Sequence, residues 1–326
     1  PAAPAEAGAW ADALASRVCG HEAAIARIAG LLARWERGRL SPGPTPHGRP
    51  LLPLALVLQG PPGVGKTSLV EAIQAARCPR GGPPFIIRGS EFKRPELLTR
   101  LLGASAMFVG HGEQGSLVRY LKSWPAGTIE IAEPEAGCAA LLDSVVLPMC
   151  DGLLTGNEGD ALSTRGCVLV LTTNAGADRD PVGFGTDRVR QTRGPGSLGG
   201  LLSEPILDRL GPGALIRLGP LTRADLGAIA RRLIIALGAA LGVELHCEVA
   251  AFERLLARSE AAGSAGARPL HQAFTEWVEG PVLDLLDRHP DLRELALTAE
   301  ENGGIEVLPV VASPTPTQES PCSPAS

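Results

Sequence analysis

The sequence predicts an α/β protein in which a parallel sheet is flanked by helices and followed by a small, mostly helical C-terminal subdomain. Apolar segments of strand length alternate with helical segments between about residues 53 and 172. Such alternation is typical of a parallel sheet with helices on both faces. A glycine-rich turn joins the first of these strands to the next helix, and from about residue 221 three helical segments follow one another.

The first subdomain is predicted to span residues 10–220, after a flexible Ala- and Pro-rich stretch at 1–9. Apolar residues such as Leu14, Ile25 and Ile28 recur at helical spacing, which predicts a helix over 12–37. The Pro- and Gly-rich segment RLSPGPTPHGRP then separates this helix from the sheet. We expect strands at 53–59, 84–88, 128–133 and 167–172, and helices from 65, near 95–103 and near 138–150.

The second subdomain is predicted to span residues 221–311 and to be mostly helical. The segment GTDRVRQTRGPGSLGG, just before it, has the composition of a mobile loop. The tail at 312–326 is rich in Pro, Ser and Thr and is expected to be disordered. We expect helices at 222–241, 248–261 and 267–288, followed by a short strand in GIEVLPVV.

Composition narrows the classes of function. Of 326 residues 44% are hydrophobic, which is enough for a large core, and the net charge is −5 with a pI near 5.8. This charge gives no electrostatic reason to expect nucleic acid or an anionic membrane as a partner. The seven cysteines are scattered without metal-site spacing, no apolar run approaches 18 residues, and the N-terminus does not resemble a signal peptide. We therefore expect a cytoplasmic protein with reduced thiols.

The strongest motif is a phosphate-binding loop between the first strand and its helix. The segment GPPGVGKT fits the pattern G-x-x-x-x-G-K-[ST]. In this pattern backbone N–H groups wrap the phosphates of ATP, Lys66 reaches the β and γ oxygens, and Thr67 supplies a hydroxyl to Mg²⁺. The predicted nucleotide-binding residues are Gly60, Pro61, Pro62, Gly63, Val64, Gly65, Lys66, Thr67 and Ser68.

Several further motifs follow in a fixed order along the chain. They are RVCGHEAAI, LLGASAMFVGHGEQGSLVRYLKSWP, LTTNAG, ILDRL and GARPLHQ. With the phosphate loop, they resemble the motifs of Clp-type AAA+ ATPases, and most of all the C-terminal ring of the Clp unfoldases and disaggregases. The resemblance covers about residues 15–310 and implies that Val18 and Cys19 line an adenine pocket.

The resemblance also implies roles for four catalytic residues. Glu133 corresponds to the glutamate that activates the attacking water, and Asn174 to the sensor that holds this water or the γ-phosphate. Arg209 corresponds to an arginine finger that reaches the nucleotide of a neighbouring subunit, and Arg268 to the sensor of the helical subdomain. A finger acting in this way requires a ring of copies, which in this family is an ATP-dependent hexamer.

Two loops would contact other proteins. Phe108, Val109 and Gly110 match the aromatic pore loop that grips an extended polypeptide substrate, and DGLLTGNEGDALSTRG occupies the second pore loop. Val182, Gly183 and Phe184 are similar to a tripeptide with which some Clp proteins dock a peptidase.

One position departs from the family pattern. Ala132 stands where the magnesium-binding Walker B aspartate is expected, seven residues after Pro125. Two nearby acids are candidates to replace it. Glu130 shares the face of the strand but lies a full repeat, roughly 6.6 Å, farther back. Glu135 follows a proline, and its side chain would have to swing in toward the site. The sequence therefore favours a protein remodeller that binds ATP, with weakened magnesium binding and slow hydrolysis.

Two other functions stay open at this stage. A nucleotide-gated assembly or regulatory module would bind ATP without turnover, as Ala132 permits. A nucleic-acid motor is a third hypothesis, against which the acidic pI and the pore aromatic argue.

Overall fold

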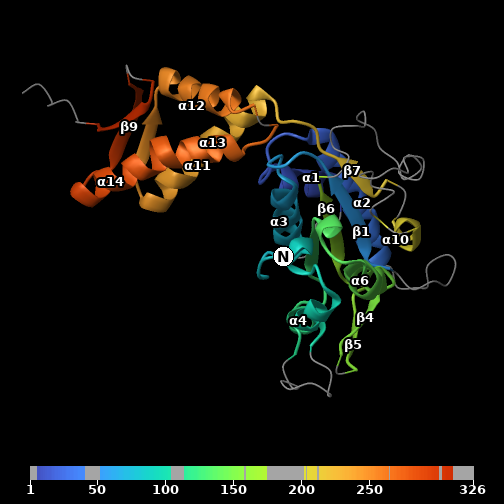
Figure 1. The fold of residues 1–326 in the computed structure, drawn as a ribbon. Coiled ribbons are helices and arrows are strands. Elements are labelled where there is room, and N and C mark those ends of the chain that lie inside the picture. Colours follow the sequence, from blue (N-terminus) through green and yellow to red (C-terminus); the bar gives the residue numbers. More distant parts are fainter. Residues whose placement is uncertain are drawn as a thin grey trace, which may run out of the picture. The chain divides into compact units, whose positions relative to one another are not determined.

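The computed structural model describes residues 6–40, 52–103, 114–157, 159–174, 202, 204–210, 213–263, 265–300 and 303–310. The chain divides into two compact units, residues 1–222 and 223–326 (Figure 1).

Unit 1 is built on a five-stranded parallel sheet, as the sequence predicts. Its strand order is β2-β3-β6-β1-β7, so the first strand of the sheet in sequence lies between two later ones. These strands are near-continuous apolar runs because helices cover both faces of the sheet. The strands are β1 Leu54–Gln59, β2 Phe85–Arg88, β3 Thr128–Ala132, β6 Val168–Thr173 and β7 Leu215–Arg217.

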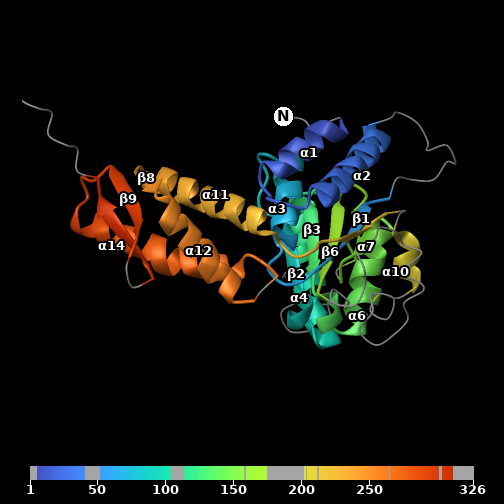
Figure 2. The same ribbon diagram turned by 90° about the horizontal axis from the view of Figure 1, so that it is seen from above.

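Alternation along the strands divides the core of unit 1 into two layers. Leu56 and Leu58 pack with helices α1 Ala7–Ala15, α2 Glu22–Leu40 and α3 Lys66–Arg77. Ala55 and Val57 face the opposite layer, which contains α5 Ser116–Ser123 and α10 Glu204–Arg209. Figure 2 shows α1 and α2 on one side of the sheet and α10 on the other.

The N-terminal helix is divided, which corrects the prediction of one helix over 12–37. Helix α1 ends at Ala15 and α2 begins at Glu22. Between them Gly20 and His21 have left-handed φ angles of 74° and 59°, which a continuous helix cannot accommodate.

The segments predicted as helices near 95–103 and 138–150 are helical but irregular. The first consists of a 3-10 turn, Pro95–Leu98, and α4 Thr99–Leu102; the second consists of α6 Ala139–Leu141, a π-helical turn at Leu142–Val146, and α7 Leu147–Cys150. Several short elements were not predicted, because four or fewer residues carry no clear periodicity. They are β7, the antiparallel hairpin of β4 Leu153–Thr155 and β5 Ala161–Ser163, and the 3-10 turns Gly89–Glu91 and Pro134–Ala136.

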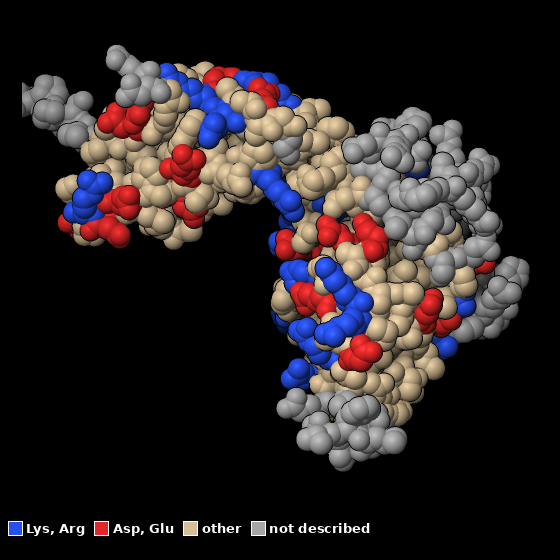
Figure 3. All heavy atoms as spheres, in the orientation of Figure 1, with Lys and Arg blue, Asp and Glu red and all other residues tan. Residues whose placement is uncertain are grey.

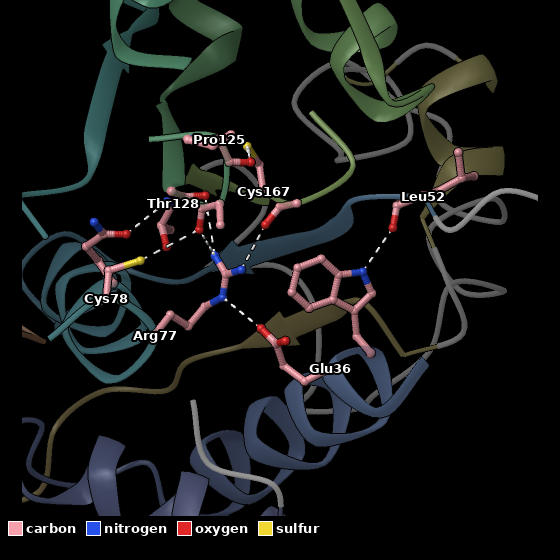
Figure 4. Close-up of polar contacts among 12 residues, drawn as sticks. Glu36, Leu52, Arg77, Cys78, Pro125, Thr128 and Cys167 are labelled. Atoms are coloured by element: carbon pink, nitrogen blue, oxygen red, sulfur yellow. Dashed lines mark hydrogen bonds and ion pairs between the residues drawn. The ribbon is translucent and has the colours of Figure 1, made fainter. Parts of the chain in front are cut away.

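A buried arginine holds the C-terminal end of α3 against the sheet (Figure 4). Arg77 Nε lies 3.3 Å from Glu36 Oε1 on α2, and the two side chains are only 3% and 8% exposed. The guanidinium also donates to the carbonyl oxygens of Ala126 and Gly166 at 2.7 and 2.8 Å, just before β3 and β6, and it stacks over Trp35. These contacts fix α3 relative to the strands that carry the residues at its other end.

Unit 2 is mostly helical, as the sequence predicts, but it also contains a three-stranded sheet of which only the last strand was predicted. Strands β9 and β10 are antiparallel, β8 and β9 are parallel, and Leu295 and Leu297 of β9 are fully buried. The helices are α11 Arg223–Leu241, α12 Val249–Ala261, α13 Arg268–Phe274 and α14 Gly280–Arg288, with a π-helical turn at Thr275–Glu279, and the strands are β8 Glu244–Cys247, β9 Glu294–Ala299 and β10 Ile305–Pro309.

Acidic and basic side chains are mixed on the surface drawn in Figure 3. Among the helices that the structure describes, none is both long and apolar enough to cross a membrane.

Candidate nucleotide site

The phosphate-binding loop leaves the carboxyl end of β1 and enters α3, where its glycines are required for the backbone path. Gly63 and Gly65 have φ angles of 81° and 99°, which favour glycine. A Cβ atom on Gly60 would lie 2.7 Å from the carbonyl oxygen of Leu218. The loop thus stands at the carboxyl edge of the sheet, beside the ends of β6 and β7, which is where ligands bind in open α/β sheets.

Lys66 is the first residue of α3, and its side chain turns back toward the loop. The ammonium group donates to the carbonyl oxygens of Gly60 and Pro61 at 2.7 and 2.8 Å, and to Asn174 Oδ1 at 2.6 Å. These contacts place the positive charge of Lys66 between the loop and the end of β6.

Asn174 connects Lys66 to Glu133. Its Nδ2 donates to Glu133 Oε1 at 2.7 Å, so three residues from separate elements form one hydrogen-bonded chain. Lys66, Asn174 and Glu133 were all predicted as site residues from the sequence, and the structure brings them together.

Glu133 has an unusual backbone conformation. Its φ of 50° and ψ of 57° are left-handed, which is uncommon for a residue other than glycine and is found at functional sites. Its N–H donates to the carbonyl oxygen of Thr172 at 2.8 Å, and Pro134 begins a 3-10 turn directly after it.

Gly89 makes room for this turn. A Cβ atom at Gly89 would lie 2.1 Å from the carbonyl oxygen of Glu133 and 3.1 Å from the nitrogen of Gly137. Gly89 was not predicted as a site residue, and its position directly after β2 is the only signal for it in the sequence.

Ala132 ends β3, where it is paired with Thr172 of β6 and Arg88 of β2. Two residues earlier, Glu130 is 1% exposed and its Oε1 accepts hydrogen bonds from Thr172 Oγ1 at 2.9 Å and from Thr67 Oγ1 at 3.3 Å. Glu130 lies two residues before Ala132 on the same face of the strand, as the sequence predicts, whereas its contact with Thr67 was not predicted.

The environment of Glu130 disfavours its charge. Burial raises the pKa of the Glu130 carboxyl above its ordinary value, although the hydrogen bonds from Thr172 and Thr67 oppose this shift. Its second oxygen, Oε2, is buried and has no hydrogen-bond partner among the described residues.

Glu135 is directed to a different hydroxyl. Its Oε1 accepts from Thr173 Oγ1 at 2.6 Å, whereas its Oε2 is buried without a partner in the described part of the chain. Glu130 and Glu135 are thus two acids with different threonine partners, and Glu130 accepts a hydrogen bond from Thr67 of α3.

The connection between α1 and α2 also reaches the phosphate loop. Val18 is 6% exposed and lies in the same apolar cluster as Val64 of the loop, and Cys19 is partly buried. His21 Nε2 donates to the carbonyl oxygen of Val64 at 2.9 Å. This contact of His21 was not predicted, although the residue belongs to the opening motif RVCGHEAAI.

Arg209 is engaged within its own chain. It donates to both carboxylate oxygens of Asp151, at 2.5 and 3.1 Å, and this pairing raises the pKa of the guanidinium. Arg268 is the first residue of α13 in unit 2. The predicted contact residues Phe108, Val109, Gly110, Val182, Gly183 and Phe184 lie outside the described residues.

The residues present fit a magnesium nucleotide rather than a metal held by protein alone. Within the described ranges, no group of three or more His, Cys, Asp or Glu side chains could hold a metal ion. Mg²⁺ is commonly held by one or two protein oxygens together with substrate phosphates and water. Thr67 Oγ1, with the unpartnered oxygen of Glu130 nearby, suits that mode of binding.

Comparisons with known proteins find related sequences. Residues 53–192 match the family described as AAA domain (Cdc48 subfamily). The ATP-dependent Clp protease ATP-binding subunit ClpE of Lactococcus lactis is 28% identical over 294 residues, covering 87% of this chain and 38% of that protein. The chaperone protein ClpB of Pseudomonas putida is 26% identical over 298 residues, covering 90% of this chain and 33% of ClpB.

A solved structure shares the fold. The closed-state cryo-EM reconstruction of Hsp104 with ATPγS and FITC casein superposes with a TM-score of 0.73 at 20% identity, over 93% of this chain and 52% of the Hsp104 chain. The chain spans about a third of the length of the two curated relatives described above, 38% of ClpE and 33% of ClpB.

Proposed function

Because the chain belongs to the Clp-type AAA+ proteins, we propose that it binds ATP with Mg²⁺ in unit 1 and hydrolyses it slowly to remodel polypeptides. The observation that carries this proposal is the hydrogen-bonded chain from Lys66 through Asn174 to Glu133. It joins a phosphate-binding cation to a carboxylate that can act as a base.

Nucleotide binding follows from the loop and the helix behind it. Gly63, Val64 and Gly65 carry backbone N–H groups for the phosphates, whereas Pro61 and Pro62 have none, and the 12-residue helix α3 directs the positive end of its dipole toward the same edge. Lys66 adds a full positive charge for the phosphate oxygens. Val18 and Cys19, beside the loop, would contact the adenine.

Hydrolysis requires a base at the γ-phosphate, and Glu133 is exposed at the end of β3 to serve as one. Its carboxylate accepts the proton of the attacking water, and the hydrogen bond from Asn174 holds the carboxylate in place. When bound, Mg²⁺ neutralises charge on the β- and γ-phosphate oxygens, and Thr67 would hold it. The methyl group of Ala132 offers no oxygen to the ion or its waters, so we expect weak magnesium binding and slow turnover.

The proposal extends to assembly. Arg209 can act as a finger only on the nucleotide of another copy of the chain, so we propose an ATP-dependent ring, a hexamer in this family. Arg209 would exchange its Asp151 partner for that phosphate. A role for Arg268 as a sensor of the bound nucleotide is proposed from its motif alone.

Contacts with other proteins are proposed from the loops. Phe108, Val109 and Gly110 would grip an extended polypeptide in the channel of the ring. Docking of a peptidase through Val182, Gly183 and Phe184 rests on the tripeptide alone.

The test is to restore the missing acid. Ala132→Asp should raise the rate of hydrolysis and lower the magnesium concentration that gives half the maximal rate. A gain of about tenfold requires only about 1.4 kcal/mol of transition-state stabilisation. A variant that folds and binds ATP but shows no gain at any magnesium concentration would count against this assignment of Ala132.

Ala132 also favours a second function. A nucleotide-gated module that assembles on binding ATP, without turnover, needs Lys66 and the loop but no magnesium acid. Assembly with ATP that is unaffected by Glu133→Gln, together with no detectable phosphate release, would favour this alternative.

A further inference from the structure

We propose that Glu130 supports the binding of Mg²⁺ in the absence of the Walker B aspartate. It does so indirectly, by orienting the hydroxyl of Thr67 toward the ion. This inference rests on the proposed nucleotide site and names a residue of that site that has no counterpart in the motifs described above. Glu130 is a positioning residue in this proposal, because it acts through Thr67 and not on the nucleotide.

The burial of Glu130 requires an explanation. A carboxylate that is 1% exposed in a strand interior is costly unless it is paired. Among the described residues, Glu130 forms no ion pair and only one of its two oxygens accepts hydrogen bonds. An apolar residue would suit this position in β3, between the fully buried Ile129 and Ile131, if the site served the core alone.

The direction of the side chain points to the nucleotide site. Ile129 and Ile131 belong to the layer of α5 and α10, so strand alternation turns Glu130 toward the opposite layer, which contains α3. Glu has one more methylene than Asp, which recovers part of the distance lost by lying two residues earlier. The 3.3 Å contact with Thr67 Oγ1 shows that the side chain reaches the first turn of α3.

The chemistry of a threonine hydroxyl explains what this contact does. The hydroxyl has one O–H to donate and two lone pairs to offer. If its hydrogen is directed to the Glu130 carboxylate, its lone pairs are left for a cation, and an anionic acceptor makes the oxygen a better ligand. Hydrogen-bond partners of metal ligands commonly tune metal affinity in this way.

Thr172 fixes the carboxylate for this task. It donates to the same Oε1 at 2.9 Å from the neighbouring strand, beside Ala132. A nearby cation would also offset the burial of the charge, since opposite charge favours the ionised form of an acid.

The test compares Glu130 with Glu135 in the full chain. The affinity for a slowly hydrolysed ATP analogue is measured by calorimetry in EDTA and at rising Mg²⁺, and Mn²⁺ bound with the analogue is followed by EPR. Glu130→Gln keeps the shape and a hydrogen-bond acceptor but removes the charge. Glu135→Gln is the matched control, because it removes the charge of the acid that pairs with Thr173.

The proposal expects a specific loss. Glu130→Gln should leave the affinity in EDTA unchanged and raise the Mg²⁺ concentration for half-maximal effect by about ten- to hundredfold, with a matching loss of Mn²⁺ affinity. Glu135→Gln should change neither quantity. Adding Ala132→Asp to Glu130→Gln should restore the metal dependence, because it returns an acid to the strand end.

Two results would overturn the inference, and they are distinguishable. If the wild-type chain binds the analogue with a magnesium effect that Glu130→Gln leaves intact, the role of Glu130 is wrong while the nucleotide site stands. If the wild-type chain does not bind the analogue at all, the proposed function and this inference fail together. Should Glu130→Gln not fold, Glu130→Asp retains the charge, retracts it from Thr67, and must show the same loss of metal affinity.

Discussion

Replacing Arg77 by Met should strongly destabilise unit 1. The side chain is 3% exposed and pairs with Glu36, which is 8% exposed. Its removal leaves a buried carboxylate without this partner, and the carbonyl oxygens of Ala126 and Gly166 lose their charged donor. Breaking one side of a buried ion pair costs about 3–5 kcal/mol, and Met fills a similar volume, so little of this cost comes from a cavity.

Urea unfolding measures the loss. With a slope of about 2–3 kcal/mol per molar urea, a loss of about 3–5 kcal/mol should lower the midpoint by about 1–2.5 M. Far-UV circular dichroism and tryptophan fluorescence can both follow unit 1, which holds Trp10, Trp35 and Trp124.

A double variant separates the charge from the packing. Glu36→Leu added to Arg77→Met also removes the buried carboxylate that has lost its contact with Arg77, and the double variant should recover much of the stability because apolar replacements of buried ion pairs are tolerated. A loss below about 1 kcal/mol for Arg77→Met alone, which is the range of an exposed ion pair, would refute the view that this arginine anchors α3.

Three further predictions concern the site. Lys66→Ala should weaken ATP binding by at least about tenfold, since a hydrogen bond to a charged group contributes about 1.5–3 kcal/mol; an unchanged affinity in a fluorescent-nucleotide titration would contradict the site. Gly89→Ala should abolish hydrolysis and spare binding, because its Cβ atom would lie 2.1 Å from the carbonyl oxygen of Glu133; normal phosphate release would show that this turn tolerates movement. Arg209→Ala should lower turnover by about 10³-fold or more in the assembled protein; light scattering that shows a strict monomer with ATP and Mg²⁺ would contradict the ring.

The sequence was most informative where a motif requires both particular residues and a particular backbone conformation. The phosphate loop could be predicted residue by residue because its glycines, Lys66 and Thr67 each have a chemical reason for their spacing. The parallel sheet followed from long apolar runs that are buried on both faces. The fully buried strand β6 is an example, since no polar residue interrupts it before Thr172.

Other features depended on contacts between distant residues. No local pattern reveals that Glu130 reaches Thr67, because the pairing depends on the register of β3 beside β6 and on the position of α3. The division between α1 and α2 was missed because apolar spacing continues across it, and only Gly20 marks the break. The pairing of Arg209 with Asp151 joins residues 58 positions apart in sequence, so no local pattern indicates it.

Steady-state phosphate release by the wild-type chain and by Glu133→Gln, at saturating ATP and Mg²⁺, tests most directly whether this protein hydrolyses ATP. Glu133→Gln keeps the hydrogen-bonding shape beside Asn174 but removes the base, so it should bind ATP normally. We predict slow release by the wild-type chain that Glu133→Gln abolishes. Equal release from the two proteins, at the level of uncatalysed hydrolysis, would contradict an ATPase and leave the nucleotide-gated module as the function of this chain.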